Sequence, residues 1–94
     1  MTYNPKPIDT SNAKLTKDIL DLTDILAKNT HDIWALQRMS EGWRYGAQRN
    51  DDRKEHPNLL AYEELSDSEK EYDRKAALET LKAIISLGYH IEKV

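Results

Sequence analysis

Hydrophobic residues between positions 15 and 41 recur at the spacing of an α-helix. One stripe of mostly apolar side chains, three or four residues apart, consists of Leu15, Ile19, Leu22, Leu26, Asn29, Ile33 and Leu36. That spacing matches a helical turn of about 3.6 residues and predicts that this first stripe faces the core. Thr16 is a typical N-cap and Gly42 a typical stop, so we expect one long helix over residues 16–41.

A second group of side chains lies on another face of the same predicted helix. At about 100° per residue, this second stripe consists of Leu20, Ala27, His31, Trp34 and Arg38. Because the first stripe already faces the core, we expect the second stripe to face solvent or a partner. The fold should therefore tolerate the loss of Trp34.

Another helix is predicted over residues 66–87. Ser66 and Glu69 have the spacing of a capping box, in which each side chain satisfies a free amide at the helix start. Gly88 fits the left-handed position after the last turn, where Tyr89 can fold back. One apolar face consists of Ala77, Leu78, Leu81, Ile84 and Ile85, and another of Tyr72, Ala76, Ala83 and Leu87. Two apolar faces on each helix exceed what one small core can bury, which favours a partner.

The remaining segments have extended and turn-rich patterns. Two prolines exclude a helix over residues 3–11, so we expect an extended strap across the helices. Residues 42–65 form a long loop, and the alternating tail 89–94 predicts a short strand against residues 13–15. The predicted fold is mainly α, with two principal antiparallel helices, the strap, the long loop and at most a small two-stranded β ribbon.

The composition is that of one ordinary globular domain, residues 1–94. Its net charge of −3 and pI of about 5.6 argue against nucleic-acid binding, which normally requires a basic excess. The absence of cysteine excludes disulfides and thiolate metal sites. Neither a signal-peptide pattern nor an apolar run of about 20 residues is present, so we expect a cytoplasmic protein without a membrane partner.

The richest stretch of the sequence lies between positions 41 and 57. It contains Glu41, Gly42, Trp43, Tyr45, Gly46, Arg49, Asp51, His56 and Pro57. Two of the three glycines of the chain occur here, which indicates bends or left-handed backbone around the aromatic residues. The basic residues of this stretch are matched by as many acidic ones, so we expect internal ion pairs. Trp43 and Tyr45 are expected to cover the loop.

Motifs along nearly the whole chain occur in a fixed order. They are Tyr3-Asn4-Pro5-Lys6-Pro7-Ile8-Asp9-Thr10-Ser11, His31-x-x-Trp34-Ala35-x-x-Arg38, Glu41-Gly42-Trp43-x-Tyr45-Gly46, His56-Pro57-x-Leu59, Glu69-Lys70-x-Tyr72-Asp73 and Leu87-Gly88-Tyr89. In order and spacing the sequence resembles the RyR domain, the ryanodine receptor repeat, and in particular its small stand-alone bacterial or phage-type members. Such domains occur in the receptors as tandem pairs, and the cleft between repeats is thought to accept adenine nucleotides.

The resemblance implies a nucleotide site that two copies complete. Trp34 would stack on the base and Arg38 would meet the phosphates, with a homodimer supplying the second half of the cleft. The residue pattern by itself leaves two interpretations open. A tryptophan beside an arginine can bind a planar anionic ligand, or the tryptophan can simply pack within the fold with the arginine at its edge. His31, one turn before Trp34, either contacts the ligand or serves the fold.

Two functions therefore remain open. One is a non-catalytic module that binds a purine nucleotide or a similar phosphate-bearing small molecule, and the other is a purely structural protein–protein interaction domain. We expect no enzyme, catalytic residue, cofactor or metal. Asp51, Asp52 and His56 lack the spacing of a metal site, and the glycines match no phosphate-binding loop.

Overall fold

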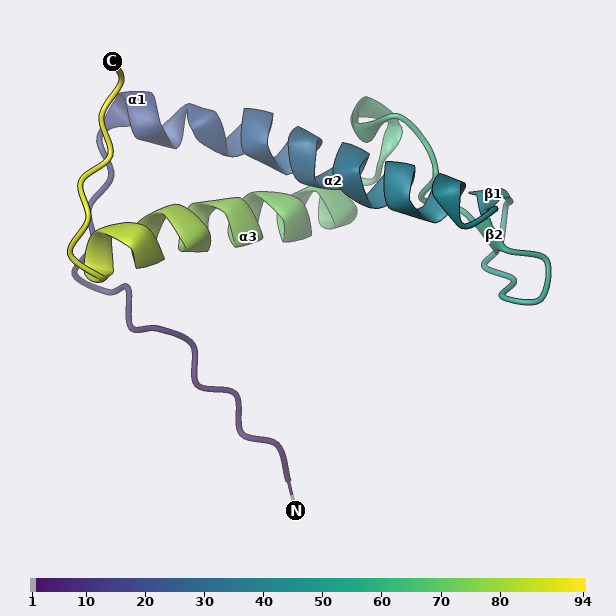
Figure 1. Cartoon of the computed structure of the whole chain (residues 1–94), viewed down its shortest axis with the longest axis horizontal. Coiled ribbons are helices and arrows are strands. Elements are labelled where there is room, and N and C mark those ends of the chain that lie inside the picture. The colour runs from purple at the N-terminus through teal and green to yellow at the C-terminus, as the bar shows by residue number, and fades with distance from the viewer. Residues whose placement is uncertain (1) are drawn as a thin grey trace.

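Two long antiparallel helices form the body of the molecule, with a small β ribbon at one end (Figure 1). The structure is a computed structural model that describes residues 2–94. In chain order its elements are α1 (Lys17–Leu20), α2 (Leu22–Ser40), β1 (Arg44–Tyr45), β2 (Glu55–His56), η1 (Tyr62–Glu64) and α3 (Asp67–Ser86). The mainly α prediction is confirmed. The first predicted helix is divided at Asp21, whose backbone nevertheless stays in the right-handed helical region.

Both long helices end at a glycine, as predicted. Gly42 has φ of 91° and Gly88 φ of 97°, the left-handed region that favours glycine. The N–H of Gly42 donates to the carbonyl of Met39, and the N–H of Gly88 to that of Ile85, each over 3.0 Å. The start of α3 is as predicted in part: the Ser66 hydroxyl accepts a hydrogen bond from the Glu69 amide over 3.2 Å. The return bond of the capping box, to the Glu69 carboxylate, is not formed among residues 2–94.

A small core lies between α2, α3 and the segment that joins the ribbon to α3. Its buried members are Ile19, Ala27, His31, Leu59, Tyr62, Leu65, Ala77 and Leu81. Of the two apolar faces predicted for α3, the one with Ala77 and Leu81 packs into the core, where both residues are buried. The second apolar face lies outside, where Tyr72 is 73% exposed.

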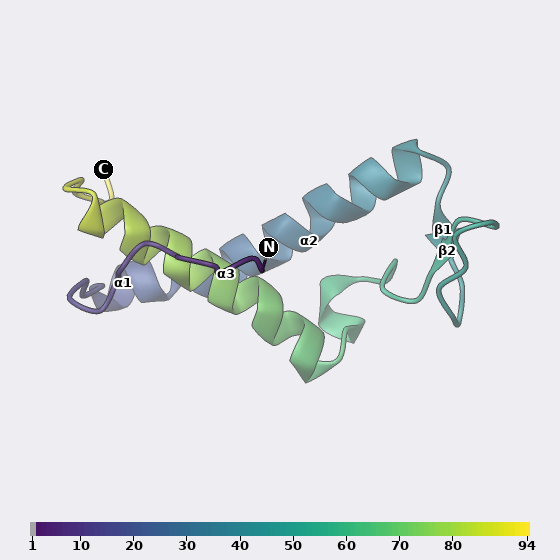
Figure 2. The same ribbon diagram turned by 90° about the horizontal axis from the view of Figure 1, so that it is seen from below.

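The core face of α2 differs from the prediction. Ile33 and Leu36 of the first stripe are 60% and 69% exposed, whereas Ala27 and His31 of the second stripe are 0% and 5% exposed. The helices diverge toward the C-terminal end of α2 (Figure 2). Beyond the crossing, the loop before α3 packs on the second stripe instead. The expectation that Trp34 lies apart from the packed face was therefore wrong, because it continues the stripe that the loop covers.

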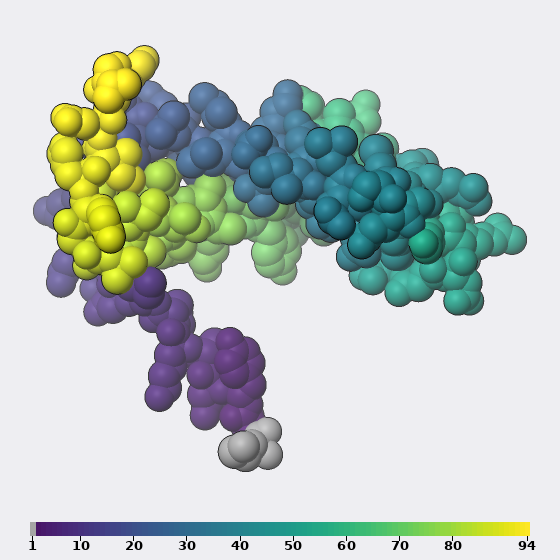
Figure 3. All heavy atoms as spheres, in the orientation of Figure 1, coloured from purple at the N-terminus to yellow at the C-terminus, as the bar shows by residue number. Residues whose placement is uncertain are grey.

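The N-terminal segment acts as a strap only in part. Residues 7–11 lie against α3, where the Thr10 hydroxyl donates to Glu79 Oε2 over 2.7 Å. Residues 2–6 leave the body of the molecule (Figures 1 and 3). Tyr3 is 83% exposed as a result.

The two-stranded ribbon lies elsewhere than the tail pattern predicted. Residues 89–94 form no strand with residues 13–15, and the ribbon pairs Arg44 with Glu55 instead. The alternating tail has few apolar side chains to bury, so its pattern alone does not hold it in a sheet. Residues 44–56 can pair because Gly46 lets their backbones approach closely.

Candidate functional site

The ribbon is built around Glu55. Its backbone exchanges two 2.9 Å hydrogen bonds with Asn50, and β1 pairs with β2 on the other side. A Cβ added to Gly46 would lie 2.6 Å from the Cβ of Glu55, so only glycine permits this approach. Lys54, with φ of 54°, closes the turn. Its Nζ also donates to the Glu41 carbonyl at the end of α2, over 2.7 Å.

This ribbon brings His56 against two tryptophans. The His56 ring lies edge-on to Trp34 of α2, with ring centroids 5.0 Å apart, and 6.2 Å from the ring of Trp43. The His31 ring also neighbours Trp34, with ring centroids 5.6 Å apart. The four rings form one aromatic cluster drawn from α2, β2 and the turn after α2. Both tryptophans are half-buried.

Arg38 lies over the indoles of this cluster. Its guanidinium carbon is 4.8 Å from the Trp43 ring centroid and 5.9 Å from that of Trp34, which are cation–π distances. Among residues 2–94 it has no ion pair within 4 Å. Arg49 lies 6.0 Å from Trp43, but its Nε donates to Asp51 over 2.8 Å. Arg38 is therefore the cation of the cluster that remains open to an anionic ligand.

A pocket of about 340 Å³ opens beside the cluster, lined by residues of both α2 and α3. It is lined by Thr30, His31, Trp34, His56, Asn58, Leu65, Glu69 and Asp73. The pocket thus combines an indole, two imidazoles and two carboxylates. Sequence reasoning did not select Glu69 or Asp73 as site residues, although their spacing of four residues places them on one face of α3.

The two histidines of the pocket are fixed by different backbone groups. His31 Nε2 lies 2.8 Å from the Leu60 carbonyl oxygen and donates to it, because a carbonyl only accepts. His56 Nδ1 accepts from the Asn58 amide over 3.0 Å, which leaves Nε2 to carry its proton. Burial lowers the pKa of His56 below its usual value, and the cations Arg49 and Arg38 lower it further. His56 is therefore held neutral.

Burial acts in the opposite direction on Asp73. It raises the pKa of this carboxyl, because the charged form is poorly solvated in the pocket wall. His31 partly offsets the rise, and the neighbouring charge of Glu69 adds to it. The pocket thus has an acidic wall on α3.

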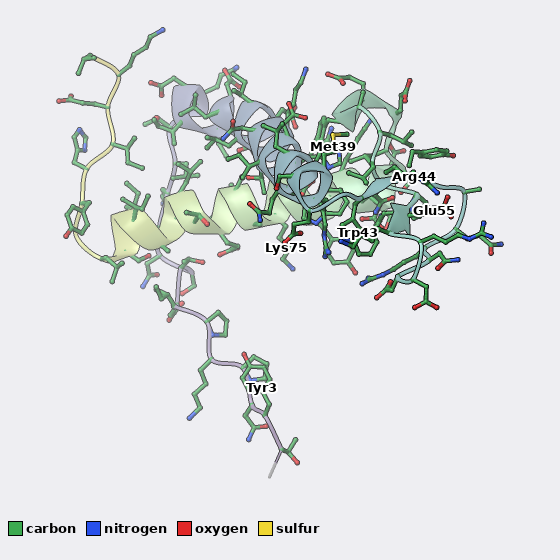
Figure 4. All side chains as sticks on the ribbon, turned by 45° about the vertical axis from the view of Figure 1, so that its right-hand side comes forward. Tyr3, Met39, Trp43, Arg44, Glu55 and Lys75 are labelled. Atoms are coloured by element: carbon green, nitrogen blue, oxygen red, sulfur yellow. The ribbon has the colours of Figure 1, made fainter. Side chains whose placement is uncertain are left out.

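The structure places the remaining residues of the predicted stretch around this cluster. Tyr45 is 53% exposed, so the prediction that it covers the loop was wrong. The predicted ion pairs are found for Arg49 with Asp51, at 2.8 Å, and for Arg44 with Glu55, at 3.5 Å. Trp43, Arg44 and Glu55 lie together at the ribbon end, far from the N-terminal arm (Figure 4). Pro57 directly follows His56 and is half-buried.

Other features of the surface are less specific. A hollow of about 780 Å³ lies between residues 7–11 and α3 and has a mixed polar lining. Within residues 2–94, no three histidine, aspartate or glutamate side chains gather closely enough to hold a metal ion. Over the same residues, no helix has both the length and the apolar character needed to cross a bilayer.

The comparison with protein families gives one match that covers nearly the whole chain. A model of the RyR domain matches residues 3–93. The chain belongs to the RyR domain family. The resemblance of the ordered motifs is thereby confirmed, and these motifs build the site: the stretch from α2 to β2 supplies the aromatic cluster of this RyR domain, and the Glu69–Asp73 motif supplies its acidic wall.

Proposed function

We propose that this RyR domain is a non-catalytic module that binds a purine nucleotide or a similar phosphate-bearing small molecule at Trp34 and Arg38. The supporting observation is the unpaired guanidinium of Arg38 over two indole rings. An arginine held in this way has its donors ready for a phosphate, and the fixed position reduces the entropy lost on binding.

The ring of Trp34 suits the base of the same ligand. It is half-buried, borders the pocket and contacts both histidine rings. A base stacked on an aromatic side chain gains about 1–3 kcal/mol. His31, His56 and Asn58 surround the position that the base would occupy, which gives them the role of orienting it.

A second copy of the domain would complete the cleft. The pocket is shallow, and a small ligand normally has most of its surface buried. α2 also exposes apolar side chains that one copy leaves uncovered, including Ile33 and Leu36. A symmetric homodimer that meets at the pocket would deepen it, since a two-fold interface uses the same patch twice. Ile33 and Leu36 lie on another face of α2 and would need a different contact. Light scattering at high micromolar concentration should give the mass of a dimer, and a monomer mass would contradict this part of the proposal.

Titration calorimetry tests the nucleotide site. We expect Arg38→Gln to weaken binding of purine nucleoside monophosphates by about tenfold to a hundredfold, the loss of a charge-assisted hydrogen bond, and to leave nucleosides nearly unaffected. Trp34→Ala should weaken nucleotides and nucleosides alike, by a similar factor. Arg53→Gln is the matched control, because Arg53 is exposed and outside the pocket.

The packing of Trp34 calls for a second variant at this position. Trp34 packs on His31 and His56, so Trp34→Ala also removes packing and Trp34→Phe should be measured beside it. The phenylalanine variant keeps a ring and should retain part of the affinity. No heat with any purine nucleotide at millimolar concentration would contradict the proposal.

The alternative function is a protein–protein interaction domain without a small-molecule ligand. It is favoured by the exposed apolar side chains of α2, where Ile25 and Met39 are 66% and 54% exposed. Contiguous apolar surface of this kind is typical of docking sites. Calorimetry without heat would favour this alternative.

A further inference from the structure

Two carboxylates on α3 form one wall of the site pocket. Glu69 and Asp73 lie four residues apart and project from the same helix face. Both are only partly exposed, and among residues 2–94 neither side chain has an ion pair or a hydrogen bond. Neighbouring carboxylates repel each other, and partial burial adds to the cost. N–H donors from a ligand would offset both effects.

A buried histidine offers a further acceptor to the same pocket. His31 is only 5% exposed, and its Nε2–H donates to the Leu60 carbonyl. In this tautomer Nδ1 is an acceptor, and within the described chain, residues 2–94, it has no hydrogen-bonding partner. Nδ1 is not fully enclosed, and His31 lines the pocket, so a donor on a ligand in the pocket can reach it.

The opposite end of the site carries the opposite charge. Arg38 follows His31 by seven residues on α2, a rise of roughly 10 Å along the helix. Trp34 lies between them and carries the ring face. An anionic group is repelled by the carboxylate wall and attracted by Arg38. A ligand is thus oriented with its phosphate at Arg38 and its donor-bearing edge at the wall.

We propose that this pocket selects guanine among the purine bases, with the ring N–H and the adjacent amino group of guanine donating to Asp73. This inference rests on the nucleotide-binding function proposed above and narrows it. Guanine presents two neighbouring donors, which match the two oxygens of a carboxylate. Adenine presents one amino donor beside a ring nitrogen whose lone pair would face the carboxylate. His31 Nδ1 and Glu69 provide further acceptors at this edge.

Calorimetric titrations of the full chain with GMP, IMP and AMP test the inference. The base of IMP lacks only the amino group of guanine. The base of AMP has one amino donor beside a ring nitrogen acceptor, in place of the two neighbouring donors of guanine. We expect GMP to bind at least about tenfold more tightly than either, as the loss of a charge-assisted hydrogen bond requires. This comparison uses the wild-type protein, so it does not depend on the folding of a variant.

The variant Asp73→Asn then tests whether Asp73 is the residue that causes the preference for guanine. The amide retains the size of the side chain but replaces one acceptor oxygen with a donor, so GMP affinity should fall by about tenfold or more. AMP affinity should stay constant or rise. Asp52→Asn, at an exposed aspartate outside the pocket, is the control and should change neither. Glu69→Gln should give a smaller loss in the same direction.

The outcomes separate this inference from the function on which it rests. Equal affinities for GMP, IMP and AMP, unchanged by Asp73→Asn, would overturn guanine selection and leave nucleotide binding in place. No binding of any of the three by the wild-type protein would overturn both.

Discussion

The two long helices end with the same local structure, yet they lead into very different regions. Gly42 ends α2 and Gly88 ends α3, and in each case the amide of the residue after the glycine also folds back onto the helix. Trp43 donates to the Arg38 carbonyl over 3.0 Å, and Tyr89 to the Ile84 carbonyl over 3.2 Å. Sequence-local hydrogen bonds thus end both helices in the same motif.

The segments beyond the two glycines differ. After Gly42 the chain forms the ribbon, and the Lys54 side chain lies 3.8 Å from where a Cβ of Gly42 would be. After Gly88 there is nothing within 4 Å of the equivalent position, and Tyr89 is 69% exposed. The contrast shows that a glycine at the end of a helix determines where the helix stops, but not how the next segment folds. Contacts between residues distant in sequence decide whether that segment folds onto the body.

The largest expected effect comes from Gly46→Ala. The new Cβ would lie 2.6 Å from the Glu55 Cβ, so the ribbon must open and the end of α2 should come to resemble the end of α3. Overpacking of this kind costs about 1–3 kcal/mol. Urea unfolding followed by tryptophan fluorescence measures the loss of stability.

A second substitution at the partner position checks the cause. Glu55→Gly removes the opposing Cβ, so the double variant should lose less stability than the two single variants together. If the stability loss of the double variant equals the sum of the two single losses, the close approach to Glu55 is not the reason for glycine at position 46.

An intermediate effect is expected from alanine at the two helix ends. Gly42→Ala and Gly88→Ala each force a side chain into left-handed backbone, which costs about 1–2 kcal/mol. The losses of stability should be similar, because the motif is the same. Only Gly42→Ala should also shift the Trp43 emission and weaken ligand binding, because only Gly42 leads into the site. A matching emission shift for Gly88→Ala would contradict this view.

The smallest expected effect is on the pH dependence of stability, and it distinguishes His56 in the ribbon from His90 in the tail. Burial holds the pKa of His56 below its ordinary value of 6.5, which the unfolded chain keeps. As the pH falls below 6.5, the unfolded state takes up this proton first, so stability decreases until the pH reaches the folded pKa. Melting temperatures from pH 8 to 5 should show this decrease, and His56→Gln should flatten it. His90→Gln, in the exposed tail, is the control; an equal flattening there would contradict the assignment.

Local signals in the sequence predicted the helices well. The Ser66 cap and the glycines at positions 42 and 88 act through hydrogen bonds within a few residues, so their effect does not depend on the rest of the fold. The aromatic and charged stretch was recognisable as a structured turn, because two of the three glycines of the chain occur in it. Its motif order identified the family, whose match to residues 3–93 agrees.

Tertiary structure decided which face of α2 packs and what completes the pocket. Periodicity identified two stripes on that helix, but the divergence of the helices determined that Ala27 and His31 are buried while Ile33 is exposed. Periodicity describes one helix by itself, and the direction of the next segment sets which face is covered.

For the acidic wall, too, the sequence shows one part and only the tertiary structure shows the other. The spacing of Glu69 and Asp73 is present in the sequence, but an exposed helix carries many such pairs. Only the approach of α3 to Trp34 and His56 places them in one pocket. The sequence by itself determined where α3 begins and ends, where α2 ends and which side chains are available for binding, but not the division of the first helix at Asp21. The tertiary structure decided which of them meet, because that depends on contacts between residues far apart along the chain.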